Sequence, residues 1–163
     1  MRRSRNDNER MEPTKHIALP NAPLLKEVRA LIAEGHDVTL RVRGVSMHPF
    51  LEDRRDMIVL TKPQASRVGD AVLAEIAPGK YVFHRIAQIV GDRVVLRGDG
   101  NVHSTEQCRL DDIAASVKQF VRKGRTCSPN GRAWRWYSAL WPSSPLARRI
   151  LLALYRRLPR RWR

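Results

Sequence analysis

The sequence predicts a mainly β domain, built as a coiled antiparallel sheet or partial barrel, with one leading helix and a basic helical tail. Three observations carry this prediction. Short segments with period-two alternation of apolar residues recur between residues 38 and 122. Glycine and proline turn signals, such as Pro78-Gly79, separate them at close spacing. Helical periodicity occurs only before and after these segments, so the helices flank the strands along the chain.

The leading helix is predicted to begin near Asn21 and to end at Gly35. Asn21 is a good N-cap residue, and Pro23 suits the first turn of a helix. Gly35 can adopt the left-handed conformation that ends many helices. The apolar residues of the segment share one face at helical spacing, and we expect that face to pack on the domain: Leu24, Leu25, Val28, Leu31 and Ile32.

The strands follow in chain order. The first covers residues 38–43, where Val38, Leu40 and Val42 alternate with polar residues, and a charged turn at residues 52–56 comes after it. The next five strands are predicted at residues 57–61, 71–76, 81–90, 93–97 and 113–122. The glycines of residues 98–101 interrupt the chain before the last of these strands.

Charge divides the chain of 163 residues into three regions. The net charge is +15, and residues 118–163 supply most of it, with 13 lysines and arginines and no acidic residue. We predict a flexible arm over residues 1–19, a β domain with its leading helix over residues 20–123, and a basic aromatic tail over residues 124–163. A tail of this charge favours an anionic surface, either phospholipid or nucleic acid.

The tail is predicted to contain a helix over residues 146–158, with apolar residues on one side and arginines largely on the other. Tryptophans and Tyr137 precede it, interleaved with Arg132 and Arg135. This combination is typical of a membrane interface, so we expect residues 118–163 to meet an anionic membrane surface. A solvated tail is the alternative, and nucleic acid is not the expected partner.

Apolar runs in the sequence are too short to cross a membrane. None approaches the ~20 residues that span a bilayer, and the arginine-rich N-terminus has no apolar stretch behind it. We therefore expect a cytoplasmic protein, peripheral at the inner membrane face. Cys108 and Cys127 are expected to be free thiols, with a single disulfide left open as the alternative. The absence of a C-x-x-C motif leads us to expect no metal site and no cofactor.

Ser46 and His84 are the candidate catalytic residues. Ser46 stands at the end of the first strand, and a serine becomes a nucleophile only when a base takes its proton. His84 follows 38 residues later in an apolar strand, and an imidazole can serve as that base near neutral pH. Asp99, in the turn after the next strand, could orient the imidazole. Taken singly, each residue also has a purely structural interpretation, as a turn serine, a buried histidine and a turn aspartate.

Three motifs together resemble the signal peptidase and LexA-like serine peptidase superfamily: Gly-x-Ser-Met-x-Pro at residues 44–49, His-Arg-Ile at residues 84–86 and Gly-Asp-x-Asn at residues 98–101. The resemblance covers residues 38–121 and implies a coiled β fold with Ser46 as the nucleophile of a serine endopeptidase. His84 stands where bacterial signal peptidases and LexA-like proteins place a lysine. The chain thus resembles the Ser/His type of endoplasmic-reticulum and archaeal signal peptidases, in which Asp99 would assist. The resemblance also implies an extended substrate with small residues near the cut, and it places Gly44 and Met47 in the substrate and oxyanion region.

The motifs depart from the superfamily at several positions. Gly44 replaces the serine that membrane signal peptidases use for the oxyanion, which leaves this task to backbone amides such as that of Ser46. Arg55-Asp56 stands where Gly-Asp is usual, and Gly100 is inserted before Asn101.

Three further side chains near the motifs are assigned to the surface. His48 and His103 are expected to be exposed. Lys80 is an alternative base, but we expect it to be solvated on the turn at residues 78–80.

Two other functions stay open. A non-catalytic module could keep the peptidase fold and bind a membrane or a partner through the basic tail. A LexA-like regulator could cleave itself, although the chain has no Ala-Gly dipeptide, the bond that such regulators cut. Only about 36 residues precede the first strand, which is too few for a helix-turn-helix domain.

Overall fold

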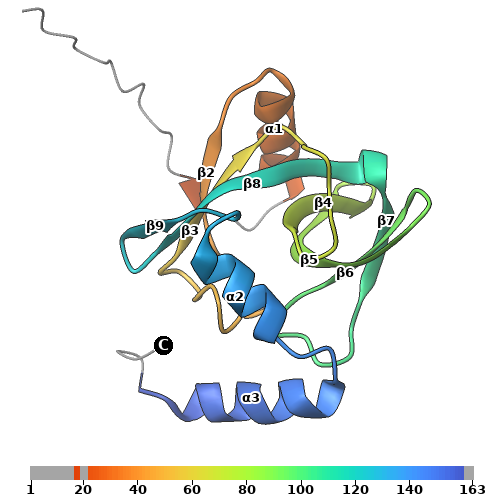
Figure 1. Cartoon of the computed structure of the whole chain (residues 1–163). Coiled ribbons are helices and arrows are strands. Elements are labelled where there is room, and N and C mark those ends of the chain that lie inside the picture. The colour runs from red at the N-terminus through yellow and green to blue at the C-terminus, as the bar shows by residue number, and fades with distance from the viewer. Residues whose placement is uncertain (1–16, 19–21, 160–163) are drawn as a thin grey trace, which may run out of the picture.

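The computed structural model describes residues 17–18 and 22–159, and this part of the chain is mainly β (Figure 1). One sheet contains the nine strands β1 (Ile17–Ala18), β2 (Val38–Arg41), β3 (Met57–Thr61), β4 (Ala71–Ala77), β5 (Lys80–Val90), β6 (Arg93–Arg97), β7 (Glu106–Arg109), β8 (Ile113–Arg122) and β9 (Arg125–Cys127). The helices are α1 (Ala22–Ala33), α2 (Arg132–Leu140), α3 (Pro145–Arg157) and the short 3-10 helix η1 (Leu110–Asp112). The predicted fold class is confirmed.

The sheet coils because its two longest strands each pair with different neighbours along their length. Its order is β1-β2-β3-β8-β4-β5-β6-β7, with β9 on β8, and every pair is antiparallel except β1 with β2. β5 pairs with β4 up to Arg85 and with β6 from Arg85 onward. His84 therefore lies where β5 changes partners.

Apolar side chains fill the domain in two clusters. The larger cluster receives the predicted face of α1, from which Val28 and Ile32 are fully buried. In the same cluster the rings of Phe50, Phe120 and Trp134 lie with centroids 4.7 to 5.2 Å apart, a packing that buries large aromatic surfaces. Because Trp134 belongs to α2, this helix of the predicted tail is anchored in the core of the domain.

The smaller cluster lies among β4, β5, β6 and β7. Its buried members are Val72, Ala74, Ile86, Val94, Leu96, Cys108 and Ile113. Burial raises the pKa of the Cys108 thiol to about 11, so this side chain packs as a neutral, small apolar group. Cys108 and Cys127 are both free, as predicted.

Strand and helix boundaries differ from the predicted ones at a few places. β2 ends at Arg41 instead of residue 43, because the carbonyl of Val42 accepts from the amide of Arg54 within the following loop and the amide of Asp56 donates to Glu52, so the ladder with β3 is not continued. The pattern does not predict β7, β9 or α2. β7 is short and has one buried residue, so it shows no alternation, and the aromatic residues of α2 are weak helix formers.

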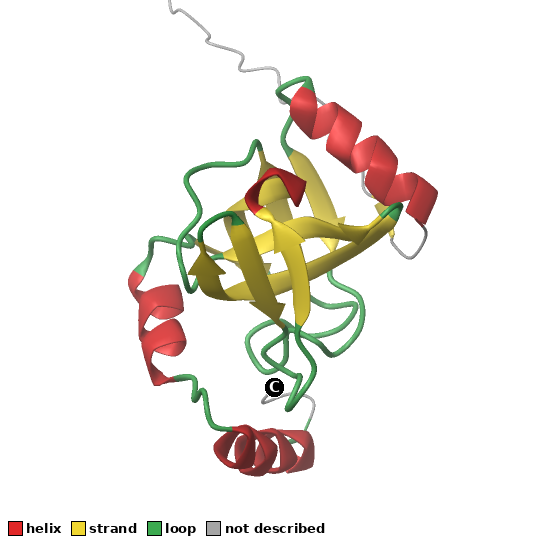
Figure 2. Cartoon of the chain, turned by 90° about the vertical axis from the view of Figure 1, so that its right-hand side faces the viewer, coloured by secondary structure: helices red, strands yellow, loops and turns green. Residues whose placement is uncertain are grey.

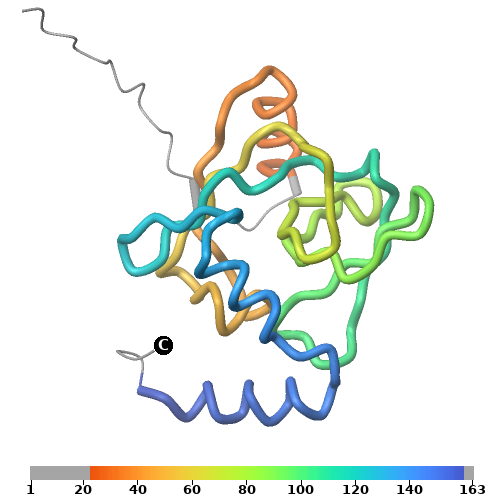
Figure 3. Tube along the Cα trace, in the orientation of Figure 1, coloured from red at the N-terminus to blue at the C-terminus, as the bar shows by residue number. Residues whose placement is uncertain are grey.

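The two outer helices lie at opposite ends of the molecule. In Figures 1 and 2, α1 stands at the upper end of the sheet and α3 at the lower end. Figure 3 shows how the chain passes from β9 through α2 to α3 along one side of the domain. Within the described residues, no helix combines the length and the apolar character that crossing a bilayer requires.

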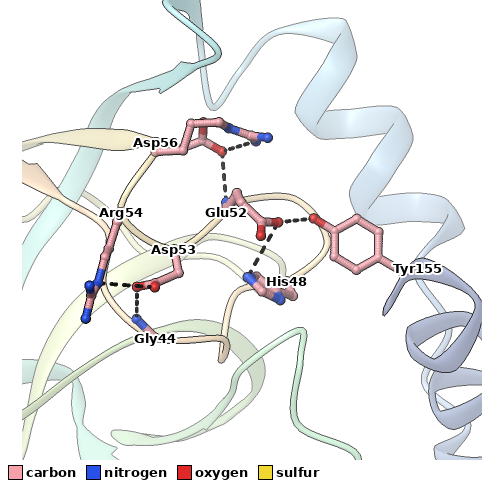
Figure 4. A network of polar contacts seen from close by, with 8 residues as sticks. Gly44, His48, Glu52, Asp53, Arg54, Asp56 and Tyr155 are labelled. Carbon is pink, nitrogen blue, oxygen red and sulfur yellow. Dashed lines mark hydrogen bonds and ion pairs between the residues drawn. The ribbon is translucent and has the colours of Figure 1, made fainter. Parts of the chain in front are cut away.

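Asp56 closes the loop between β2 and β3 (residues 42–56), which we call the nucleophile loop after the role predicted for Ser46. Its side chain is fully buried and accepts hydrogen bonds from the amides of Glu52 and Lys123, at 2.8 and 3.1 Å, and from the Arg55 guanidinium at 2.7 Å (Figure 4). Burial acts to raise the pKa of this carboxyl. The hydrogen bonds from Arg55 and from the two amides outweigh burial and hold the pKa below its ordinary value of 3.8.

Asp56→Asn is expected to lower the free energy of unfolding by about 2–3 kcal/mol, because hydrogen bonds to a charged acceptor are lost inside the loop. The folded-state pKa is lowered, so the stabilisation by Asp56 is present above the unfolded-state value and is lost as the pH falls through the folded-state value. Urea unfolding at several pH values checks this. The gap between wild type and variant should be constant near neutral pH and should close below about pH 4. A gap that does not change with pH would show that the charge of Asp56 is unimportant.

Candidate active site

Ser46 is half-buried in the nucleophile loop. Gly44, two residues earlier, has a φ of 84°, a conformation that residues with a side chain rarely adopt. The amide of Gly44 donates a hydrogen bond to Asp53 at 2.8 Å, and Arg54 donates its amide to the Val42 carbonyl at 2.9 Å. The loop is thus held on both sides of Ser46. The Gly44 amide, which the resemblance places in the oxyanion region, bonds within the loop in this structure.

His84 projects from β5 with only 5% of its surface exposed. Its Nδ1 lies 2.8 Å from a carboxylate oxygen of Glu106, the first residue of β7. The other ring nitrogen, Nε2, lies beside Gly98, where an added Cβ atom would be 3.1 Å from it. Hence a carboxylate contacts the ring at one nitrogen, and the other nitrogen lies beside the glycine that approaches the Ser46 carbonyl.

One cavity of about 300 Å³ is bordered by both Ser46 and His84. Its remaining walls come mainly from β2, from the start of β5 and from α1, and they are largely apolar: Leu25, Leu40, Arg41, Val42, Arg43, Met47, Ile58, Leu73, Tyr81, Val82 and Phe83. The structure therefore brings the two predicted catalytic residues to the same cavity, and Met47 borders it as well.

Two glycines bring residues 98–101 against the nucleophile loop. The amide of Gly100 donates to the Ser46 carbonyl at 2.8 Å. A Cβ atom at Gly98 would lie 2.5 Å from the Ser46 carbonyl oxygen and 3.1 Å from Nε2 of His84, so one small residue fills the space between them. A Cβ atom at Gly100 would lie 2.1 Å from the carbonyl oxygen of Val45. Only glycine permits this approach at both positions.

The predicted partner of His84 was Asp99, and the structure gives Asp99 different contacts. Asp99 is fully buried and accepts two hydrogen bonds from the Arg85 guanidinium, at 2.9 and 2.7 Å, and one from the Tyr137 hydroxyl at 2.8 Å. Burial, followed by the charge of Asp99, raises the pKa of Tyr137, which keeps its hydroxyl a donor. Asp99 therefore ties β5 to α2, and the acid at the imidazole is Glu106.

Three side chains were assigned to the surface, and the structure exposes two of them. The expectation that His48 is exposed is wrong: it is buried, with Nε2 3.6 Å from Glu52 and its ring edge-on to Tyr155 of α3 (Figure 4). His103 is exposed as expected. Lys80 is exposed at the first position of β5.

Sequence patterns did not indicate three residues that support the site. Glu106 lies in a strand without alternation, so no signal pointed to it. Arg148 of α3 is buried and donates to the carbonyls of Gly98 and Asn101 at 3.1 and 3.2 Å. Tyr155 of the same helix donates a hydrogen bond to Glu52 in the nucleophile loop. The tail thus contacts both the nucleophile loop, which borders the cavity, and residues 98–101, which lie against that loop.

Gly100→Ala is expected to lower the free energy of unfolding by about 1–3 kcal/mol, because the new methyl group collides with the backbone of Val45 and pushes the nucleophile loop away. Chemical denaturation measures the loss. Gly91→Ala is a control for a methyl group added in open space, since no atom lies near the added Cβ, and the strain of its positive φ should cost about 1–2 kcal/mol. A loss below about 1 kcal/mol for Gly100→Ala would mean that the close approach of the loops contributes nothing.

A family model described as Peptidase S24-like matches residues 7–121. A search of the curated proteins gives no match. The matched region includes Ser46, His84 and Glu106, whereas α2 and α3 lie beyond it. The match extends over more than half of the chain and agrees with the coiled β fold and with the motifs at residues 44–49, 84–86 and 98–101. The chain belongs to the Peptidase S24-like family.

Proposed function

We propose that this protein is a serine endopeptidase in which Ser46 is the nucleophile, His84 the general base and Glu106 the residue that orients the base. One observation carries the proposal. Ser46 and His84 border the same cavity, while Glu106 contacts Nδ1 of the imidazole at 2.8 Å and leaves Nε2 beside Gly98. A serine, a histidine and a carboxylate in these relations are the groups that acyl transfer requires.

The reaction would proceed in two halves. With the Nδ1 hydrogen donated to Glu106, Nε2 of His84 takes the proton of the Ser46 hydroxyl as the oxygen attacks the peptide carbonyl. The same nitrogen returns this proton to the leaving amine, and the new amino-terminus departs from an acyl-enzyme. His84 then takes a proton from water as the water oxygen attacks the ester, and it returns this proton to the Ser46 oxygen as the acid product leaves. Glu106 stabilises the imidazolium that forms in each half.

The negative oxygen of the tetrahedral intermediate needs hydrogen-bond donors from the backbone. Since the Gly44 amide already donates to Asp53, the amide of Ser46 is the donor that we propose. Met47 contributes to substrate binding through the cavity wall.

The substrate would be a peptide or protein precursor that binds in extended form. The cavity is small and its wall is largely apolar, with Leu40, Tyr81 and Phe83 among its members, which favours small or apolar side chains beside the cut. β1 pairs with β2 at Leu40 and Arg41, beside the cavity, so an extended segment can lie along β2 at this place.

Ser46→Ala and His84→Ala are each expected to reduce cleavage by about a thousandfold or more, because the nucleophile or its base is removed. The purified full chain is incubated with a mixed peptide library, and the products are identified by mass spectrometry. Ser66→Ala and His103→Ala, which change the same residue types outside the cavity, should leave the rates unchanged. Ser46→Ala producing the wild-type fragments at the wild-type rate would overturn the proposal.

Self-cleavage is the second candidate, and one observation favours it. β1, a segment of the chain's own N-terminal region, pairs with β2 through Ile17 with Leu40 and Ala18 with Arg41, and both of these β2 residues border the cavity. The same incubations without a library distinguish the candidates. Fragments of the chain that appear at alkaline pH in the wild type, and not in Ser46→Ala, would indicate a regulator that processes itself.

Glu106→Gln is expected to lower kcat by about a hundredfold or more while KM and the free energy of unfolding change little, because glutamine keeps the shape but cannot stabilise the imidazolium. Asp99→Asn should behave differently, with a loss of stability of about 3 kcal/mol as buried Arg85 loses its charged partner. Kinetics and urea unfolding of both variants separate the two acids. A stable Asp99→Asn with low kcat, beside a fully active Glu106→Gln, would return the orienting role to Asp99.

A further inference from the structure

α3 turns its apolar face away from the protein. Helices on globular domains normally bury this face. Here the buried side chains are Arg148 and Leu152, with Tyr155 half-buried beside them. The outward side chains keep 41–67% of their surface exposed: Leu146, Ile150, Leu151, Leu154 and Leu158. An exposed leucine-rich helix face marks an interaction surface.

Contacts of the inner face fix this orientation. Arg148 donates to the carbonyls of Pro142, Gly98 and Asn101 at 2.7 to 3.2 Å, and Tyr155 donates to Glu52. These bonds join α3 to the nucleophile loop and to residues 98–101, which lie against it. The leucines are therefore exposed on a helix that is held in place, at the lower end of the molecule in Figures 1 and 2.

The charge around this face has one sign. Residues 118–163 contain no aspartate or glutamate, and α3 carries the exposed arginines Arg149, Arg156 and Arg157. α2, which precedes it, adds the exposed cations Arg132 and Arg135 together with Trp136, which is 63% exposed. Leucines bordered by arginines are the composition of helices that lie in the headgroup region of anionic bilayers.

We propose that the outer face of α3 docks on the surface of an anionic lipid bilayer, with the leucines entering the acyl boundary and the arginines meeting lipid phosphates. The 13-residue helix is about 20 Å long, which suits a helix lying in the plane of the interface and not one crossing it. This proposal does not depend on peptidase activity. If both hold, the membrane brings the cavity close to substrates at its surface, because the inner face of α3 bonds the loops around the cavity.

Other occupants fit these observations less well. A second copy of the chain would bring two surfaces of the same positive sign together, which opposes association. A nucleic acid would satisfy the arginines through its phosphates, but it would leave the row of leucines against a charged backbone. Only the bilayer offers negative charge and apolar surface in adjacent layers.

Sedimentation of the full chain with vesicles tests the proposal. Vesicles of phosphatidylcholine and phosphatidylglycerol should bind the wild type, and vesicles of phosphatidylcholine alone should bind it at least about tenfold less. Changing Leu146, Ile150 and Leu154 together to Gln should weaken binding to the anionic vesicles by about tenfold or more, because no charge changes but the apolar contact is lost.

Val68→Gln with Val90→Gln is the matched control, since these valines are 62% and 52% exposed on other parts of the surface. This double variant should bind vesicles as the wild type does. The proposal is overturned if the wild type does not bind anionic vesicles, or if the triple variant binds them equally well. It is also overturned if the triple change abolishes a dimer, or binding to an oligonucleotide, while vesicle binding is absent. Circular dichroism spectra that match the wild type confirm that the triple variant is folded.

Discussion

The ion pair between Arg85 and Asp99 is the contact on which the site and the tail both depend. Arg85 follows His84 on β5, and Asp99 lies between the two glycines that approach the nucleophile loop. The Arg85 guanidinium also lies 4.4 Å from the ring of Trp134, and Tyr137 bonds the same carboxylate. A buried ion pair stabilises a fold only when the other hydrogen-bonding positions of both groups are also satisfied. The Tyr137 hydroxyl of α2 satisfies one such position of Asp99. The histidine, the loop and the tail are thereby held as one unit.

The helices α2 and α3, which lie beyond the matched region, stabilise the loops near the cavity. Without α2, the Asp99 carboxylate would lose the Tyr137 hydroxyl, and the aromatic cluster of Phe50 and Phe120 would lose Trp134. Without α3, the carbonyls of Gly98 and Asn101 would lose Arg148. Helices that lie outside the matched residues 7–121 thus support loops that lie inside them.

The sequence predicts those elements in which apolar residues recur regularly, such as α1, β5 and β8, because a regular period follows directly from backbone geometry. The resemblance of the motifs predicts that Ser46 and His84 belong to one site, and in the structure both residues border the same cavity. Glu106 could not be predicted, because its contact with His84 arises from the coiling of the sheet, and β7 has no alternation. The orientation of α3 could not be predicted either. Periodicity shows that a helix has two faces, and here the carbonyls that bind Arg148 decide which of them turns inward.

The position of β7 at the edge of the sheet affects which part of the protein opens first on heating. β7 has four residues and is the last strand in the sheet order, hydrogen-bonded to β6. Short strands at a sheet edge separate at a lower free energy than the strands at its centre. The carboxylate that orients the imidazole is therefore carried by a strand that can detach while β3, β8 and β4 stay paired. The proposed peptidase activity would then be lost by a local and reversible opening, at temperatures where the core is still folded.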